Sequence, residues 1–228
     1  MFPLTDENPH SKIPYVNYFI IGVNIFLFLF EISFPIQSLK ILFYNYGVVP
    51  ARYFSPSLVS EFSFSSNPLI PFFSSMFLHG GWLHIIFNMW ALFIFGDNVE
   101  DKLGHFNYLL FYLGSGLIAG IIHAIFNYNS IVPSIGASGA IAGVMAAYVI
   151  LFPGANIKTL FIIFFFPIIV SVPALIFVCL WFFSQLFTGT LSLFNGASGG
   201  TAWWAHIGGF IAGVGLLFMF KKKKKRLF

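Results

Sequence analysis

The chain has 228 residues, of which 58% are hydrophobic and only 8% are charged. This composition leaves too few polar side chains to cover a water-soluble domain, so it excludes a soluble globular protein and predicts an integral membrane protein. The net charge of +4 does not indicate nucleic-acid binding, because six of the eleven basic residues form one block, KKKKKR at 221–226, directly after a hydrophobic run.

Six hydrophobic runs are expected to form membrane-spanning helices, so the predicted fold is an all-α bundle in a single domain over residues 1–228. Runs of about 17 to 25 apolar residues match the thickness of a bilayer, although the second and fourth runs are shorter. The N-terminal residues lack the basic region of a signal peptide, and nothing is expected to be cleaved off. The runs occupy residues 18–34, 83–95, 108–126, 138–152, 160–183 and 203–220.

Two segments between these runs have a distinct composition. The loop between the first two runs, of roughly forty residues, is rich in aromatic residues, serine and proline, and is long enough to carry structure of its own at the membrane surface. The phenylalanine-rich stretch FIIFFFP at 161–167 is expected to lie in the fifth helix and to face lipid. The single cysteine, Cys179, excludes an internal disulfide and a thiolate metal site.

The basic residues predict the orientation in the membrane. With six spans, residues 1–17 and the tail at 221–228 lie on the same side. Placing both in the cytoplasm puts nine basic residues inside (Lys12, Lys102, Lys158 and six in the tail) and two outside (Lys40 and Arg52). This agrees with the positive-inside rule, so the second, fourth and sixth helices are expected to begin at the outer face.

Polar side chains within membrane spans are costly and usually functional. They collect at the starts of three helices: His79, His84 and Asn88 at the second, Ser138 at the fourth and His206 at the sixth. Ser138 and His206 each precede the inner surface by 15 residues and His84 by 13, which at 1.5 Å per residue gives depths of roughly 20 to 22 Å. The three side chains are therefore expected to share one level.

Small residues spaced four apart predict that the fourth and sixth helices pack closely. This pattern lets two backbones approach each other in lipid. The contact would bring Ser138 beside His206. The glycines in the pattern are Gly139 and Gly143 on the fourth helix, and Gly209 and Gly213 on the sixth.

A serine hydroxyl becomes nucleophilic when a base within about 3 Å accepts its proton, and histidine suits that task. Ser138 and His206 form such a pair. The nearest acidic residues, at 97–101, lie at the opposite surface, some 20 Å away by helical rise, so we expect a dyad without an aspartate. The backbone N–H of Ser138 and the side chains of His84 and Asn88 would form the oxyanion hole.

The tetrapeptide GASG occurs twice, around Ser138 and around Ser198. Ser138 opens a hydrophobic helix, which directs its amide and the helix dipole at one point. Ser198 falls in a loop rich in glycine, serine and threonine, at 188–201, that is expected outside the membrane. Ser138 is therefore the predicted nucleophile and Ser198 a loop residue.

Three segments resemble motifs of the rhomboid intramembrane serine proteases in their basic six-helix, bacterial-type form. SMFLHGGWLHIIFNMWALFIFGDNVEDKLG at 75–104 resembles the second-helix signature. GASGAIAGV at 136–144 resembles the nucleophile motif, and AHIGGF at 205–210 resembles the sixth-helix motif that carries the base. The resemblance covers roughly residues 75–215.

This resemblance implies a serine endopeptidase that cleaves peptide bonds in or near transmembrane segments of other membrane proteins. It implies partners in the lipid bilayer and in transmembrane substrates, with no cofactor and no metal. It also implies a bacterial inner membrane, with the active site opening to the outside. The sequence does not indicate an oligomeric state or a particular substrate.

The resemblance assigns roles to individual residues. Ser138 would be the nucleophile and His206 the general base and acid. His84 and Asn88, with the amide of Ser138, would form the oxyanion hole. The residues supporting the site would be His79, Gly136 and Gly139.

Two positions depart from the family pattern. The first loop lacks the Trp-Arg pair that many relatives carry. Ala142 stands where some members place a tyrosine beneath the catalytic histidine, so another residue must hold the imidazole.

Other functions remain open as alternatives. A catalytically inactive rhomboid-like protein that binds membrane-protein clients is one, although such a protein is expected to have lost Ser138 or His206. A metalloprotease is disfavoured because HExxH is absent and His79 and His84 are five residues apart. A transporter is disfavoured because inverted halves and buried ion ligands are not found.

Overall fold

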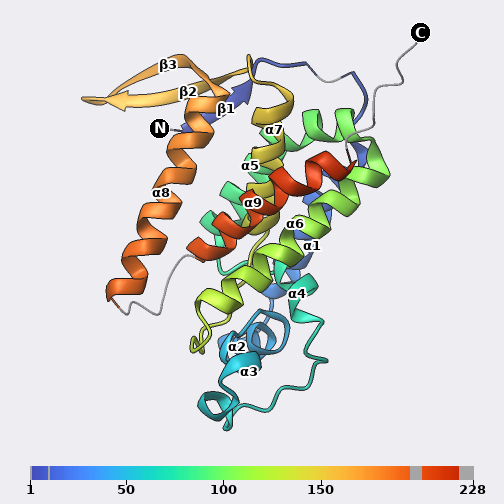
Figure 1. Ribbon diagram of the computed structural model, residues 1–228, viewed down its shortest axis with the longest axis vertical. Coiled ribbons are helices and arrows are strands. Elements are labelled where there is room, and N and C mark those ends of the chain that lie inside the picture. Colours follow the sequence, from blue (N-terminus) through green and yellow to red (C-terminus); the bar gives the residue numbers. More distant parts are fainter. Residues whose placement is uncertain (1, 10, 196–201, 221–228) are drawn as a thin grey trace.

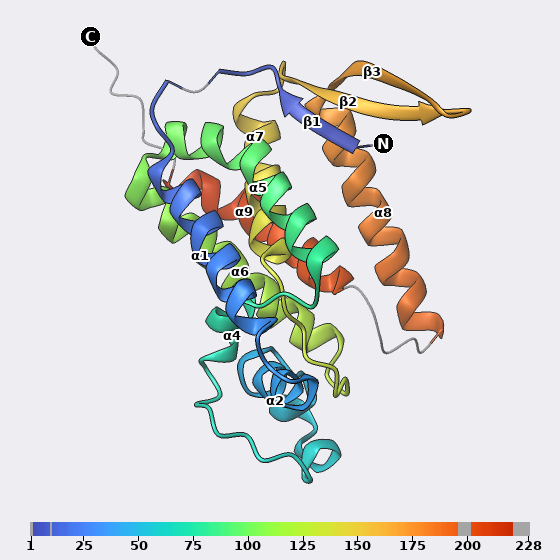
Figure 2. The same ribbon diagram turned by 180° about the vertical axis from the view of Figure 1, so that it is seen from behind.

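The computed structural model describes residues 2–9, 11–195 and 202–220 (Figures 1 and 2). Ser198 and the tail at 221–228 lie outside the described residues. Long helices make up most of the described chain, and a small β-sheet covers one end of the bundle. The long helices are α1 (Tyr15–Glu31), α5 (Trp82–Leu103), α6 (His105–Phe126), α7 (Ser138–Leu151), α8 (Ala174–Asn195) and α9 (Trp203–Phe220).

Several of these helices have the length and apolar character needed to cross a membrane. Within the described ranges, three helical segments meet both criteria: His105–Phe126, Ala174–Leu191 and Trp203–Phe220. A fourth is added if Pro71–Phe77 and Trp82–Leu103, bent by 93° at the break between them, are taken as one span. Helices α1 and α7 are apolar but shorter, with 17 and 14 residues. The chain is an integral membrane protein, as its composition predicts.

The predicted fifth helix, at 160–183, is wrong over its first part. Residues 156–173 form a β-hairpin of β2 (Asn156–Ile163) and β3 (Phe166–Pro173), and α8 begins only at Ala174. Hydropathy alone does not separate a short apolar strand from a helix. This stretch is rich in isoleucine, valine and phenylalanine, which favour strands, and Pro167 would interrupt a helix.

The N-terminal residues also form a strand that the sequence analysis missed. Strand β1 (Phe2–Asp6) pairs antiparallel with β2, which gives a three-stranded sheet in the order β1-β2-β3. The all-α prediction is therefore corrected to a mostly helical fold with one small sheet. The sheet lies at the end of the bundle where α7 ends and α8 begins (Figure 1).

The segment between α1 and α5 carries short helices at the opposite end of the bundle (Figures 1 and 2). Val48 in this segment exchanges backbone hydrogen bonds of 3.0 and 2.8 Å with Ser134. This bridge braces the chain four residues before Ser138. The short helices are α2 (Ile36–Tyr46), α3 (Ala51–Phe54), η1 (Pro56–Val59), α4 (Pro71–Ser74) and η2 (Ser75–Phe77).

Helices α7 and α9 approach each other through glycines. A Cβ atom added at Gly209 would lie 1.8 Å from the carbonyl oxygen of Gly139. One added at Gly213 would lie 2.4 Å from the Cα of Gly143. The backbones touch at these positions, which sets how far apart Ser138 and His206 lie.

Replacing Gly209 by alanine is expected to destabilise the protein by about 1–3 kcal/mol, because the added methyl group overpacks a backbone contact. Thermal unfolding in detergent micelles measures the effect. Gly215→Ala is the matched control on the same helix, since a Cβ there meets no atom of the described residues within 4 Å. Equal unfolding temperatures for the two variants would contradict the packing of α7 on α9.

Candidate active site

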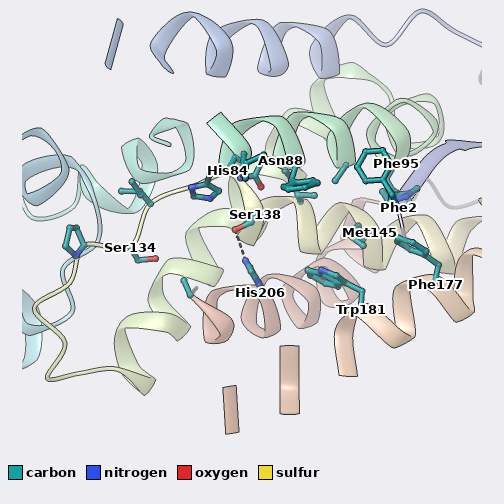
Figure 3. Close-up of a pocket in the computed structure, with 18 residues that line it drawn as sticks. Phe2, His84, Asn88, Phe95, Ser134, Ser138, Met145, Phe177, Trp181 and His206 are labelled. Carbon is teal, nitrogen blue, oxygen red and sulfur yellow. Dashed lines mark hydrogen bonds between the residues drawn. The ribbon is translucent and has the colours of Figure 1, made fainter. Parts of the chain in front are cut away.

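Ser138 and His206 lie in direct contact (Figure 3). Ser138 is the first residue of α7, and His206 lies in the first turn of α9. The Oγ atom of Ser138 is 2.7 Å from Nε2 of His206. This distance allows the hydroxyl to pass its proton to the imidazole.

The second ring nitrogen of His206 contacts a residue that the sequence analysis did not include. Its Nδ1 atom lies 2.6 Å from Oε1 of Gln185 in α8. The amide nitrogen of Gln185 donates to Oγ of Ser184 at 3.0 Å, which directs Oε1 toward the ring. Because an amide oxygen only accepts, Nδ1 carries the hydrogen and Nε2 presents its lone pair to Ser138.

Trp181 also holds the imidazole. It lies one helical turn before Gln185, and its ring centroid is 5.7 Å from that of His206. Ala142, which stands where some rhomboid-like sequences place a tyrosine, is fully buried and too small to fill this role.

Gln185 lies two residues beyond the predicted fifth run at 160–183, but α8 continues to Asn195. Its polar side chain in an apolar helix is the signal that could have found it, by the same rule that singled out Ser138 and His206.

The side chains of His84 and Asn88 lie on the other side of Ser138 and line the same pocket (Figure 3). The N–H of Gly80 donates to Nδ1 of His84 at 3.4 Å, so the hydrogen of this ring lies on Nε2 and can be donated into the pocket. The amide nitrogen of Asn88 donates to the carbonyl of His84 at 3.0 Å, which leaves its second hydrogen free.

Gly136 allows the chain to pass close to His84. Its φ of +122° is rarely adopted by residues with a side chain, and a Cβ there would lie 2.6 Å from Nε2 of His84. The N–H of Gly136 donates to the carbonyl of Ser75 at 2.8 Å. A larger residue would push His84 out of place.

His79 contacts His84 and does not line the pocket that contains Ser138. Its side chain is 1% exposed, and its ring centroid is 5.0 Å from that of His84. Its backbone N–H donates to the carboxylate of Glu31 at 3.1 Å, which ties the start of α5 to the end of α1. His79 therefore packs against His84 and is linked through its backbone to α1.

A cavity of about 700 Å³ extends between α5, α7 and α8. Its polar end is lined by the side chains of His84, Asn88, Ser138 and His206. The other end is apolar (Figure 3). A cavity of this size accommodates several residues of an extended peptide. Its apolar end is lined by Phe2, Phe95, Met145, Phe177 and Trp181, among others.

Within the described ranges, no three His, Cys, Asp or Glu side chains gather as metal ligands would.

The model of the Rhomboid domain matches residues 66–223, which is more than half of the chain and includes every residue of the pocket's polar end. The chain belongs to the rhomboid family. All three motifs that carry the resemblance lie within the matched region.

Individual rhomboid relatives match shorter stretches. Rhomboid-like protein 11, chloroplastic, of Arabidopsis thaliana is 31% identical over 133 residues, 58% of this chain and 41% of that protein. Rhomboid protease AarA of Providencia stuartii is 38% identical over 89 residues, 33% of this chain and 32% of AarA. RHOMBOID-like protein 6, mitochondrial, of Arabidopsis thaliana is 42% identical over 74 residues, 32% of this chain and 24% of that protein.

The chain therefore spans less than half the length of these rhomboid relatives. Two of them carry names that refer to mitochondria or chloroplasts, and the third comes from the bacterium Providencia stuartii. The expected bacterial inner membrane gains no support from this mixture.

Strand β1 closes the apolar end of the pocket in this rhomboid. Phe2 and Pro3 line the pocket, and the indole N–H of Trp90 in α5 donates to the carbonyl of Pro3 at 2.7 Å. Asp6 accepts hydrogen bonds of 2.8 Å from the side chains of Asn98 and Tyr148. Burial raises the pKa of the Asp6 carboxyl above its ordinary value. The strand is thus attached to both α5 and α7.

The acidic residues at 97–101 lie near the C-terminal end of α5, where they make structural contacts. The carboxylate of Glu100 accepts hydrogen bonds from the N–H groups of Val16 at 3.0 Å and Asn17 at 2.7 Å. It therefore caps the start of α1, and it also contacts the ring of His105. The imidazole of His206 contacts an amide, Gln185, in place of a carboxylate.

Proposed function

We propose that this protein is an intramembrane serine endopeptidase that cleaves peptide bonds in or near transmembrane segments of other membrane proteins. The contact of 2.7 Å between Ser138 Oγ and His206 Nε2 carries this proposal. Membership of a family that includes a protein named as a rhomboid protease supports it. Six spans with both termini in the cytoplasm, and a site open to the opposite side, are part of the proposal.

The proposed reaction begins at Ser138. His206 Nε2 takes the hydroxyl proton while Oγ attacks the scissile carbonyl. The oxyanion that forms is stabilised by the amide of Ser138 at the start of α7 and by donors from His84 and Asn88. His206 then gives its proton to the leaving amine. In the second half of the reaction, His206 takes a proton from a water molecule, the water attacks the acyl ester, and the proton returns to Oγ of Ser138 as the acid product leaves.

The apolar end of the pocket would accept hydrophobic side chains of a substrate helix. The carbonyls of a helix are held in backbone hydrogen bonds, so attack requires local unwinding. Segments with helix-breaking residues are therefore expected to be cut most readily. A segment would reach the pocket between α5 and α8, whose side chains face each other across it.

The proposal is tested by incubating the purified protein, in detergent and in liposomes, with a generic transmembrane substrate. Cleavage fragments whose masses place the cut in or next to the membrane span are expected. Stable binding without cleavage would favour the alternative, a catalytically inactive rhomboid-like protein that binds clients.

Gln185 is proposed to position the imidazole. Gln185→Leu is expected to lower kcat by about 10- to 100-fold with KM nearly unchanged, because it leaves the buried Nδ1–H without a partner, at about 1–3 kcal/mol. Gln185→Glu places a negative charge beside Nδ1, which favours the protonated ring. Since only the neutral imidazole accepts the serine proton, the low-pH limb of kcat is expected to move to higher pH. Kinetics of both variants across pH provide the measurement.

Thr190→Ala is a suitable control, because Thr190 is exposed on the same helix and, in the described structure, its hydroxyl donates to the backbone carbonyl of Leu186. It is expected to leave kcat and its pH profile unchanged. Unaltered kcat in Gln185→Leu, or an unmoved low-pH limb in Gln185→Glu, would remove Gln185 from the proposed mechanism.

A further inference from the structure

The tip of the β2–β3 hairpin has an unusual turn. Ile163 pairs with Phe166, so only Phe164 and Phe165 connect the strands, and both have positive φ angles, 47° and 72°. Such two-residue turns favour Asn-Gly, because a side chain disfavours this backbone conformation. A phenylalanine pair at these positions is conformationally unfavourable. The presence of the two phenylalanines is therefore not explained by a preference for this turn.

The rings at the tip are almost fully exposed in the part of the chain that the structure describes. Phe164 is 88% exposed and Phe165 is 97% exposed. Their neighbours Ile162 and Phe166 are each 72% exposed. A single exposed apolar residue is ordinary, but a cluster of this kind marks a surface that meets an apolar phase.

The hairpin becomes less polar from root to tip. At the root, Lys158 is exposed and Ser171 donates to the carboxylate of Glu7 at 3.1 Å. Beyond the root, no Asp, Glu, Lys or Arg occurs in the sequence between Lys158 and Lys221. The root suits water and the tip suits hydrocarbon.

The hairpin is tethered to the bilayer surface. Strand β3 ends at Pro173, and α8, which contains one of the candidate membrane spans, begins at the next residue. Leu175, Ile176 and Leu180 near the start of α8 are exposed, as are the apolar residues 168–170 of β3. Figure 1 shows the hairpin reaching sideways from the start of α8, away from the other helices. The nearest apolar phase is the membrane that already surrounds α8.

We propose that the tip of the hairpin, residues 162–166, inserts into the lipid leaflet beside α8. The insertion is shallow, because β1 pairs with β2 only as far as Leu160 and the strand edges beyond it need water or lipid headgroups as hydrogen-bond partners. The rings would reach the boundary between headgroups and acyl chains while the backbone stays at headgroup level. The inserted tip would hold the first turn of α8, and with it one wall of the pocket, at a fixed depth.

Spin labels report the depth directly. Cys179 is first replaced by serine, and a single label is then placed by Phe165→Cys, by Lys158→Cys at the hairpin root or by Leu180→Cys on the lipid face of α8. The full-length protein is reconstituted in vesicles of phosphatidylcholine and phosphatidylglycerol. Relaxation by oxygen, which partitions into lipid, is compared with relaxation by a polar nickel chelate, which stays in water.

The label at 165 is expected to prefer oxygen severalfold more than the label at 158, and to approach the ratio found at 180. Equal nickel access at 165 and 158 would overturn the proposal. Shielding from both reagents, with spin–spin broadening that disappears on dilution with unlabelled protein, would show that a second copy covers the tip and would also overturn it.

The double variant Phe164→Asn/Phe165→Gly separates the rings from the turn. It supplies the residues that this turn favours, so the hairpin is expected to stay folded. A label introduced by Ile162→Cys is then expected to lose its preference for oxygen relative to the same label in the parent hairpin. An unchanged preference would contradict the role of the two rings as the inserted group.

Discussion

Replacing Ser138 with alanine is expected to abolish cleavage of a transmembrane substrate, lowering kcat by at least about 10³-fold. His206→Ala is expected to have a loss of the same order, and the double variant is expected to be little worse than either single one. The reason is that the hydroxyl and the imidazole act as one unit across the 2.7 Å contact. Initial rates in detergent with a fluorescent transmembrane substrate measure these effects.

Ser198→Ala is the control, since Ser198 sits in the second GASG copy, which the sequence predicts to be a loop. Its rate is expected to match that of the unmodified protein. If the Ser138→Ala variant kept its rate, or the Ser198→Ala variant lost it, the proposed assignment of the nucleophile to Ser138 would be wrong. Circular dichroism of each variant checks that a lost rate does not reflect lost folding.

His84→Ala and Asn88→Ala are each expected to lower kcat by about 10²-fold or more while KM changes little. Both side chains would donate to charge that develops only in the transition state, so their removal leaves substrate binding intact. Steady-state kinetics with the same substrate separate kcat from KM.

Ile86→Ala serves as the control for α5, because Ile86 is exposed and does not line the pocket. It is expected to change neither parameter. If His84→Ala and Asn88→Ala raised KM at constant kcat, the two residues would bind substrate and would not form an oxyanion hole.

Much of the helical bundle could be predicted because hydrophobic length is a strong signal. The runs at 138–152 and 203–220 coincide closely with α7 and α9. Ser138 and His206 could be paired because polar residues are rare in spans, and because glycines spaced four apart indicate where two helices touch.

The hairpin could not be predicted from hydropathy. Residues 160–170 are as apolar as a span, and only their strand-forming residues and Pro167 distinguish them. Strand β1 was missed because five residues carry too weak a pattern, and its pairing with β2 joins residues more than 150 positions apart in the chain.

Gln185 was missed for a different reason. It is 21 residues from His206, and their contact depends on how α8 and α9 are rotated about their axes, which tertiary packing decides. It also lies two residues beyond the predicted fifth run, which ends at 183, so it was not considered among the polar residues within spans.

The most direct test of the proposed active site is labelling with a serine-directed fluorophosphonate, followed by peptide mapping. The expected result is a single adduct on Ser138 that disappears in His206→Ala, because the probe reacts only with a hydroxyl that a base activates. An adduct on Ser198, or cleavage of substrate by a protein in which Ser138 resists the probe, would contradict the account.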